Sequence, residues 1–148
     1  MKVGVLLPSR FEDPGEFLAD ARAMEAAGAD SIWLEEGDGY DAMLALAAIA
    51  AVTGQLRLGL IVPEGSPSLS RRGLETLQLL SRQRVITGGN ERWRRVEVPA
   101  DREAWARTLE LAQTNFDGVL VPMDPRLLDI LRHPEDAIDR SDLQLAQG

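Results

Sequence analysis

Short runs of Val, Ile and Leu recur along the chain at a nearly constant spacing. The runs that begin at Val3, Ser31, Arg57 and Arg84 are 28, 26 and 27 positions apart, with helix-like stretches between them. A spacing of this kind indicates an internal repeat of one strand–helix unit. Because strands that alternate with helices pair in parallel through right-handed crossovers, the spacing predicts an α/β protein with a parallel sheet.

The chain offers six candidate strands. The run at 94–99 alternates polar and apolar residues, which predicts an edge strand, whereas the other runs are apolar enough to be buried on both faces. A full eightfold βα barrel needs about 250 residues, and the chain has 148. We therefore expect one α/β domain over residues 1–148 with about six mostly parallel strands, either a shortened TIM-barrel-like fold with an incomplete or open barrel, or an open parallel sheet. The candidate strands are 3–7, 31–34, 57–62, 84–87, 94–99 and 118–121.

The helices between these strands carry recognisable start signals. Asp13 is expected to cap the first helix, with Pro14 in its first turn, and Asp101 is expected to cap the fourth. Trp33 is expected in the core. Trp93 and Trp105 flank the predicted edge strand, so they are expected either to pack together or to form a subunit contact.

Composition excludes several classes of function. A net charge of -8, from 16 basic and 24 acidic residues, disfavours binding to nucleic acid or to an anionic membrane. The longest apolar stretch, 42–52, is too short to span a bilayer, and we expect a cytoplasmic protein. With no cysteine and His133 as the lone histidine, thiolate and multi-histidine metal sites are excluded, and we expect no metal ion.

The loops that follow the strands are the expected binding site, because ligands of parallel βα proteins bind at the carboxyl ends of the strands. This rim is acidic and rich in glycine, with one cation on its first loop. Adjacent glycines also expose backbone amides that suit an anion. The candidate ligand-binding residues are Arg10, Glu36, Glu64, Gly88, Gly89 and Asn90.

The turn Glu35-Glu36-Gly37-Asp38 has three interpretations. It is a solvated turn in which Asp38 or Asp41 caps the next helix, a carboxylate site for a hard cation, or a site of acid–base catalysis by a carboxyl group of raised pKa. Sequence motifs for nucleotide binding, serine hydrolysis and zinc peptidases are missing. The sequence alone leaves these three interpretations open.

The order of the motifs resembles the first half of the luciferase-like monooxygenase family. The matching segments are "MKVGVLLP", "FLADARAMEAAGADSIWLEEGD", "YDAMLALAAIAAVTGQLRLGLIVP" and "SPSLSRRGLETLQLLSRQRVITGG", which together cover residues 1 to about 90. The rest of the chain resembles one or two further βα units, with the middle strands of the family missing. The resemblance implies a βα barrel scaffold that binds FMN or a deazaflavin.

The resemblance implies two alternative functions. The first is a flavin-dependent oxidoreductase or monooxygenase of unknown substrate, with the candidate residues around the cofactor. The turn at 35–38 lacks the histidine that family members often carry there, so no catalytic residue is predicted. The alternative is a shortened, inactive scaffold without any cofactor that acts as a homodimer or as a subunit of a larger complex. In both cases we expect a homodimer, and in the first a small-molecule substrate.

Overall fold

Five parallel strands form one sheet in the computed structural model, which describes residues 1–65, 69–87 and 89–132. The strand order is β3-β2-β1-β5-β4. The first strand, β1, therefore lies in the middle of the sheet, where it pairs with the last strand, β5. The two outer strands, β3 and β4, do not pair with each other, and the barrel is open. The strands are β1 (Lys2–Leu6), β2 (Ser31–Glu35), β3 (Arg57–Ile61), β4 (Trp93–Arg95) and β5 (Gly118–Pro122).

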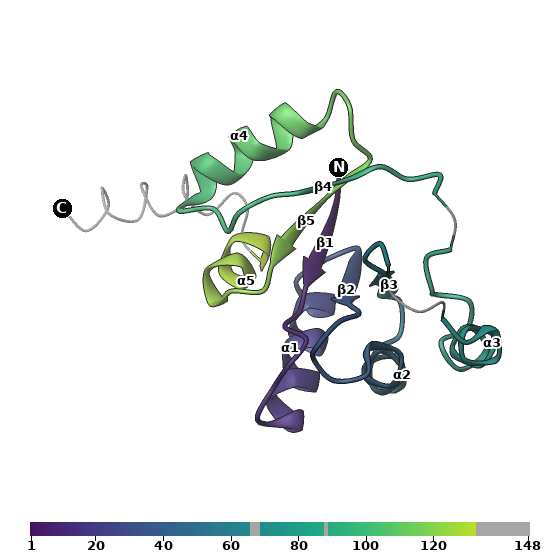
Figure 1. Ribbon diagram of the computed structural model, residues 1–148. Coiled ribbons are helices and arrows are strands. Elements are labelled where there is room, and N and C mark those ends of the chain that lie inside the picture. The colour runs from purple at the N-terminus through teal and green to yellow at the C-terminus, as the bar shows by residue number, and fades with distance from the viewer. Residues whose placement is uncertain (66–68, 88, 133–148) are drawn as a thin grey trace.

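Five helices accompany the strands within the described residues. Figure 1 shows them along an arc on one side of the sheet, from α3 through α2, α1 and α5 to α4, while the chain that joins α3 to β4 runs past the other side. This arrangement is that of a βα barrel cut open. The helices are α1 (Pro14–Ala26), α2 (Ala42–Val52), α3 (Arg71–Leu80), α4 (Arg102–Ala112) and α5 (Pro125–Arg132).

The predicted helix caps are confirmed. The Asp13 carboxylate accepts hydrogen bonds from the first amides of α1, and Asp101 accepts one from Ala104 N at 2.7 Å. At the start of α2 the cap is Asp41, whose carboxylate accepts from Leu44 N at 3.0 Å. These bonds satisfy amides that have no partner inside the helix. Asp41, rather than Asp38, therefore has the capping role foreseen for the acidic turn.

The two faces of the sheet differ in composition. On the face toward the helices, aliphatic side chains of the strands are fully buried against helix residues such as Met24 and Leu46. On the opposite face, glycines alternate with tryptophans and charged residues. The aliphatic face holds the main core, to which the strands contribute Val5, Ile32, Leu34, Leu58, Val119 and Val121.

The prediction of an α/β fold with an open parallel sheet is confirmed, but the strand predicted at 84–87 is wrong. Only Val85 pairs with a strand, as an isolated bridge to Leu58. The two residues before Arg84, Arg82 and Gln83, both have positive φ, which turns the chain sharply after α3. This turn lies directly before the segment, whose pairing with β3 is limited to one bridge, so a regular strand does not develop.

Arg84 also holds this segment against the end of α2, in addition to the single bridge to β3. Its guanidinium donates to the carbonyl oxygens of Ala50 at 2.7 Å, Leu56 at 3.0 Å and Thr53 at 3.1 Å. Burial lowers the pKa of this arginine, although the Glu25 carboxylate opposes that effect. The side chain thus caps the carboxyl end of α2 with a positive charge.

Candidate functional site

The loops after β1 and β2 pack against each other at the carboxyl edge of the sheet. The Phe11 and Phe17 rings stack with centroids 4.1 Å apart, and Tyr40 meets Phe11 edge-on at 4.9 Å. Tyr40 N donates to Ser9 O at 2.9 Å. This aromatic cluster fixes the acidic turn relative to the first loop.

Arg10 reinforces the same contact between the two loops. Its guanidinium donates to the carbonyl oxygen of Asp38 and lies over the Tyr40 ring, 5.7 Å from the centroid. The predicted ligand-binding cation is thus at the predicted edge, but it is engaged in holding the acidic turn. Sequence reasoning placed Arg10 correctly and could not see this contact.

Glu36 is half-buried at the same edge. Its backbone amide donates to Ile61 O at 2.9 Å, while its carboxylate has no hydrogen bond or ion pair with a described residue. Glu64 follows β3 and is exposed. In the described part of the chain, no three potential ligands gather into a group that could hold a metal ion. Glu36 is therefore a free hydrogen-bond acceptor beside the ends of β2 and β3.

Below this edge, two tryptophans cover the face of the sheet that the helices leave open. The Trp33 indole lies on Gly59, where a Cβ atom would overlap the ring, and Trp93 lies in the same way on Gly118. The two rings meet edge to face, with centroids 5.1 Å apart. Trp93 therefore packs on Trp33 and not on Trp105, which is buried in the main core.

The tryptophan contact spans the middle of the sheet. β2 and β4 are separated by β1 and β5, a distance of about 14 Å in a flat sheet with strands 4.8 Å apart. The side chains meet because Gly4 carries no side chain between them: a Cβ there would lie 2.6 Å from Trp33 Nε1. The Trp33 indole donates to the buried Ser31 Oγ at 2.8 Å, whereas the Trp93 Nε1 is buried without an acceptor.

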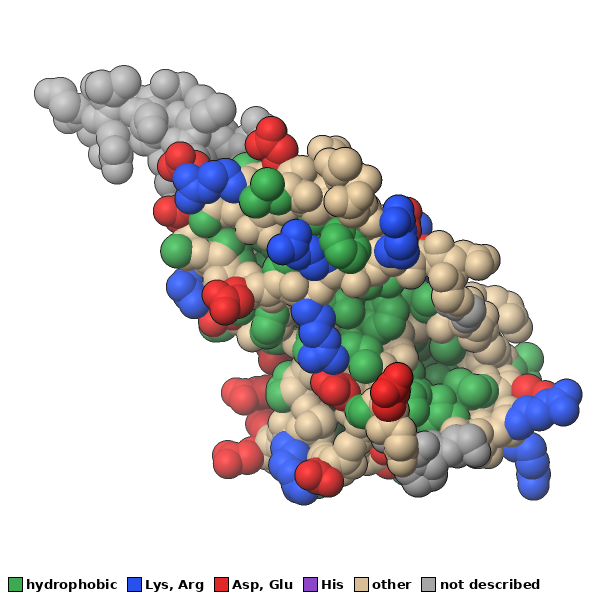
Figure 2. Space-filling model, turned by 45° about the horizontal axis from the view of Figure 1, so that its top comes forward, with side chains coloured by type: hydrophobic (Ala, Val, Ile, Leu, Met, Phe, Trp, Pro, Cys, Tyr) green, Lys and Arg blue, Asp and Glu red, His purple; other side chains and the backbone are tan. Residues whose placement is uncertain are grey.

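A salt bridge crosses the sheet directly beyond the tryptophans. Arg95 Nη2 lies 3.0 Å from Glu35 Oε2, and these residues follow Trp93 and Trp33 by two positions on β4 and β2. Residues two apart on a strand point to the same face. Figure 2 shows hydrophobic side chains gathered in a hollow in the middle of one face of the molecule, with charged side chains around them.

The residues before β4 lie at the opposite, amino edge of the sheet. The Glu91 carboxylate accepts from Lys2 Nζ at 2.8 Å and from both terminal nitrogens of Arg57 at 3.0 and 3.1 Å. Lys2 and Arg57 begin β1 and β3. Arg57 also donates to Asp30 at 2.7 Å. This amino-edge network, defined by Lys2, Asp30, Arg57 and Glu91, ties the connection from α3 to β4 across the sheet.

The amino-edge network changes the ionisation of its members. Hydrogen bonds from Arg57 and then Lys2 lower the pKa of Glu91 to about 2. The bond to Glu91 in turn raises the pKa of Arg57, assisted by Asp30 and opposed by burial. The ion pair between Glu91 and Arg57 is therefore retained over the whole ordinary pH range.

The structure does not bring the predicted site residues together. Arg10, Glu36 and Glu64 follow β1, β2 and β3 at the carboxyl edge. Asn90 instead lines a hollow with Arg57 and Glu91 at the amino edge, with Gly89 next to it. Gly88 lies outside the described residues.

Sequence reasoning missed the side chains that form the opposite wall of the site, Arg95 and Trp93. A signal was present, because Trp33-x-Glu35 and Trp93-x-Arg95 place the same pattern, an aromatic and then a charge of opposite sign, on one face of two strands. It could not be used without knowing that β1 and β5 lie between β2 and β4. Asp124, after β5, also lies at the carboxyl edge, where the backbone and side chain of Arg126 lower its pKa.

An open parallel βα sheet with a polar rim at the carboxyl ends of its strands defines a protein of the βα barrel class. The family model of the luciferase-like monooxygenases matches residues 1–117. The chain belongs to this family, as the resemblance in its first 90 residues implied. No curated protein matches the chain. Over the described residues, none of the helices has the length and apolar character that a membrane crossing requires.

The side chains on the open face of the sheet determine where a flavin has room and where it does not. Its middle is filled by Trp33 and Trp93, which lie on the glycines and leave no cradle for a ring there. At the carboxyl edge above them, Arg95 provides a cation for a phosphate and Glu36 a free acceptor. Within the described residues, the polar groups that could hold a flavin thus lie at this edge and not within the sheet.

Proposed function

We propose that the chain is a flavin- or deazaflavin-dependent oxidoreductase whose cofactor binds at the carboxyl edge, between the ends of β2 and β4. The observation that carries the proposal is the Glu35–Arg95 pair above the two indoles, in a chain of the luciferase-like monooxygenase family. Sites for small ligands generally combine apolar surface with few polar groups that orient the ligand.

The chain's own residues have distinct tasks in this proposal. Trp33 and Trp93 form an apolar floor that excludes water from the underside of the ligand. Glu36 accepts a hydrogen bond from a ring N–H, and Arg95 neutralises an anionic group. Arg10 acts indirectly, because it holds the turn that carries Glu36. The bound flavin supplies the electron and hydride chemistry, for which the protein provides binding and orientation.

Titration with FMN, and separately with a deazaflavin coenzyme, tests this proposal. We expect saturable binding of at least one of them at micromolar concentration, measured by the quenching of the ligand's fluorescence. We expect Glu36→Ala to bind it more weakly. Glu64→Ala is the matched control at the same edge, because its side chain is exposed on the outer loop. If the folded protein binds neither coenzyme, the proposal is wrong.

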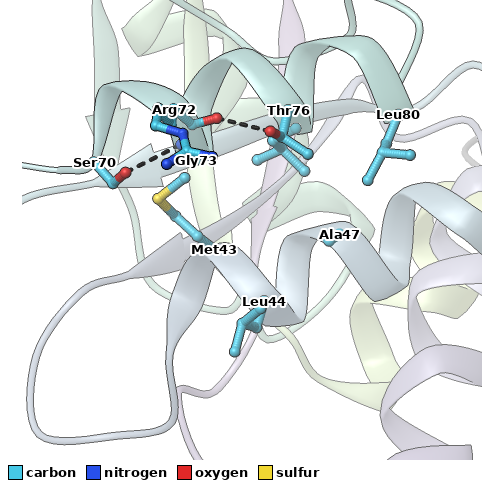
Figure 3. Close-up of a pocket in the computed structure, with 9 residues that line it drawn as sticks. Met43, Leu44, Ala47, Ser70, Arg72, Gly73, Thr76 and Leu80 are labelled. Atoms are coloured by element: carbon cyan, nitrogen blue, oxygen red, sulfur yellow. Dashed lines mark hydrogen bonds between the residues drawn. The ribbon is translucent and has the colours of Figure 1, made fainter.

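A second candidate function, a scaffold that acts as a homodimer, is favoured by α2. This helix, "AMLALAAIAAV", has no polar side chain, and Leu44 is 72% exposed. Helices that are apolar on all sides are normally buried. Figure 3 shows a groove between α2 and α3, where Met43 points toward Gly73 and Leu80 toward α2. The groove has a volume of about 410 Å³.

Charge around this groove favours a second copy of the chain as its occupant. α2 and α3 both start at the carboxyl edge, where Asp41 caps α2 and the exposed Arg72 lies in the first turn of α3. A two-fold axis parallel to these helices places Arg72 at the level of Asp41 of the partner subunit. The uncharged surface of α2 is then buried between two symmetry-related ion pairs, each formed by Arg72 and Asp41 of the partner subunit. The same surface of both subunits contributes, as in an isologous interface.

Sedimentation or light scattering with two leucine variants tests the dimer. We expect the wild-type chain to be dimeric and Leu44→Asp to be monomeric. Leu111→Asp is the matched control, because Leu111 on α4 is equally exposed at 72% and lies outside the groove. A monomeric wild-type protein, or a dimer that survives Leu44→Asp, would exclude this interface.

A further inference from the structure

The salt bridge between Glu35 and Arg95 at the carboxyl edge suggests a specific role for each of these residues. We propose that Arg95 binds the anionic group of the ligand, a phosphate or carboxylate, and that Glu35 is an internal competitor which the anion displaces. The inference deepens the proposed cofactor site and rests on it only in the choice of FMN as ligand. It makes Glu35 a residue that weakens binding, and Arg95 a residue that provides it.

The position of the pair supports this role. Arg95 and Glu35 are the last residues of β4 and β2, and ligands of parallel βα sheets bind at these ends. Each lies on the same face as the tryptophan two positions before it. The salt bridge therefore lies across the space directly above the Trp33–Trp93 contact, where the aromatic ring of a ligand would lie.

The salt bridge is also weak enough to exchange. The side chains of Glu35 and Arg95 are 40% and 55% exposed, and they share one contact at 3.0 Å. Exposed pairs of this kind contribute little to stability, because water and salt screen them. A phosphate or carboxylate offers two oxygens in the plane of the guanidinium, which forms a bidentate contact stronger than the single one it replaces. Glu35 then turns into solvent, where it is already partly hydrated.

Other cations of the described residues are less suited to this role. At the carboxyl edge, Arg10 is held by Asp38 and Tyr40, and Arg126 pairs with Asp124. At the amino edge, Arg57 has two carboxylate partners. Arg95 differs from these residues because one half-exposed carboxylate on another strand is its recorded partner.

A comparison of FMN with riboflavin isolates the contribution of the anion, because the two ligands differ in the phosphate. We expect wild-type protein to bind FMN about tenfold more tightly than riboflavin, the size of one charge-assisted contact. Arg95→Gln should bind both ligands equally. Glu35→Gln should bind FMN several-fold more tightly than wild type and leave riboflavin unchanged. Arg94→Gln is the control, since Arg94 lies on the same strand, faces Phe116 and should have no effect.

Each outcome separates this inference from the proposed function. If both flavins bind equally to wild type and to Arg95→Gln, the cofactor site stands and the role of Arg95 is wrong. If neither flavin binds, the proposed cofactor is wrong. The inference is then tested by titration with pyrophosphate, and the fluorescence of Trp33 and Trp93 reports binding. A saturable change that is enhanced in Glu35→Gln and lost in Arg95→Gln would support it. No response in Glu35→Gln would overturn it. Circular dichroism confirms that each variant is folded.

Discussion

The two ends of the open face of the sheet use the same chemistry for different purposes. At the amino edge, Glu91 is 24% exposed and receives three hydrogen bonds from two cations. At the carboxyl edge, Glu35 is 40% exposed and receives one hydrogen bond, from Arg95. The first arrangement is a fixed network that holds the chain together, whereas the second can be exchanged for a ligand.

The difference teaches how a chain with few strands can keep an open barrel ordered. In place of middle strands, the amino-edge network holds the connection from α3 to β4, and two indoles fill the space above it. The carboxyl edge is left with an isolated charged pair. The following predictions test this division, from the floor between the two ends to each end in turn.

Substitution of Gly59 should have the largest effect, because it removes the space on which the floor depends. A Cβ at Gly59 would overlap the indole of Trp33, which is buried and has little room to move. We expect Gly59→Ala to lower the free energy of unfolding by about 3 kcal/mol, the upper range for overpacking. Gly54→Ala is the matched control, since a Cβ there meets nothing within 4 Å. Urea unfolding of both variants measures the difference, and equal stabilities would refute the floor.

Loss of the Glu91 charge should have the next largest effect. Glu91→Gln keeps the shape of the side chain but removes the charge that Lys2 and Arg57 share. We expect the free energy of unfolding to fall by about 1–2 kcal/mol, the value of charge-assisted hydrogen bonds reduced for partial exposure. The measurement is chemical unfolding at neutral pH. If the free energy of unfolding changes by less than it does for a typical surface substitution, the amino-edge network does not stabilise the fold.

Acid should remove the same stabilisation gradually. The pKa of Glu91 falls from its ordinary 4.5 to about 2 on folding, so its contribution is complete above pH 4.5 and is lost as the pH falls toward 2. We expect the stability gap between wild type and Glu91→Gln to close over this range. Glu25, whose pKa is also lowered by backbone hydrogen bonds although burial raises it, is present in both proteins and cancels. A constant gap across unfolding curves from pH 6 to pH 2 would show that Glu91 is not the group concerned.

Removal of the Glu35 charge should have the smallest effect on stability. We expect Glu35→Gln to change the free energy of unfolding by less than about 0.5 kcal/mol, as for exposed ion pairs. Thermal unfolding beside Glu91→Gln makes the comparison direct. A loss at Glu35 as large as the loss at Glu91 would mean that both ends are structural.

The sequence predicts the local structure well because local signals determine it. The apolar runs located β1, β2, β3 and β5, the first three at a regular spacing, and Asp13 and Asp101 marked helix starts where the amides need acceptors. The segment 84–87 has strand-like composition but forms only a single bridge to β3, since Arg82 and Gln83 turn the chain directly before it and Arg84 binds the end of α2. Composition alone does not contain such long-range contacts.

Only some residues of the candidate site could be predicted from local sequence signals. Arg10, Glu36 and Glu64 were found because any loop after a parallel strand lies at the carboxyl edge. Asn90 was grouped with them on the assumption that residues 84–87 form a strand, and the loss of that strand leaves it at the other edge. Arg95 depends on strand order, which the spacing of the repeats does not determine.

In the proposed arrangement the carboxyl edge binds a flavin, while the amino edge is structural. The most direct test is the NMR spectrum of the indole N–H groups and the arginine side chains during titration with FMN. The account predicts that Trp33, Trp93 and Arg95 shift together to saturation, while Trp105 in the main core and Arg57 in the amino-edge network remain unchanged. Shifts confined to Arg57 and its neighbours, or no shift in the folded protein, would contradict it.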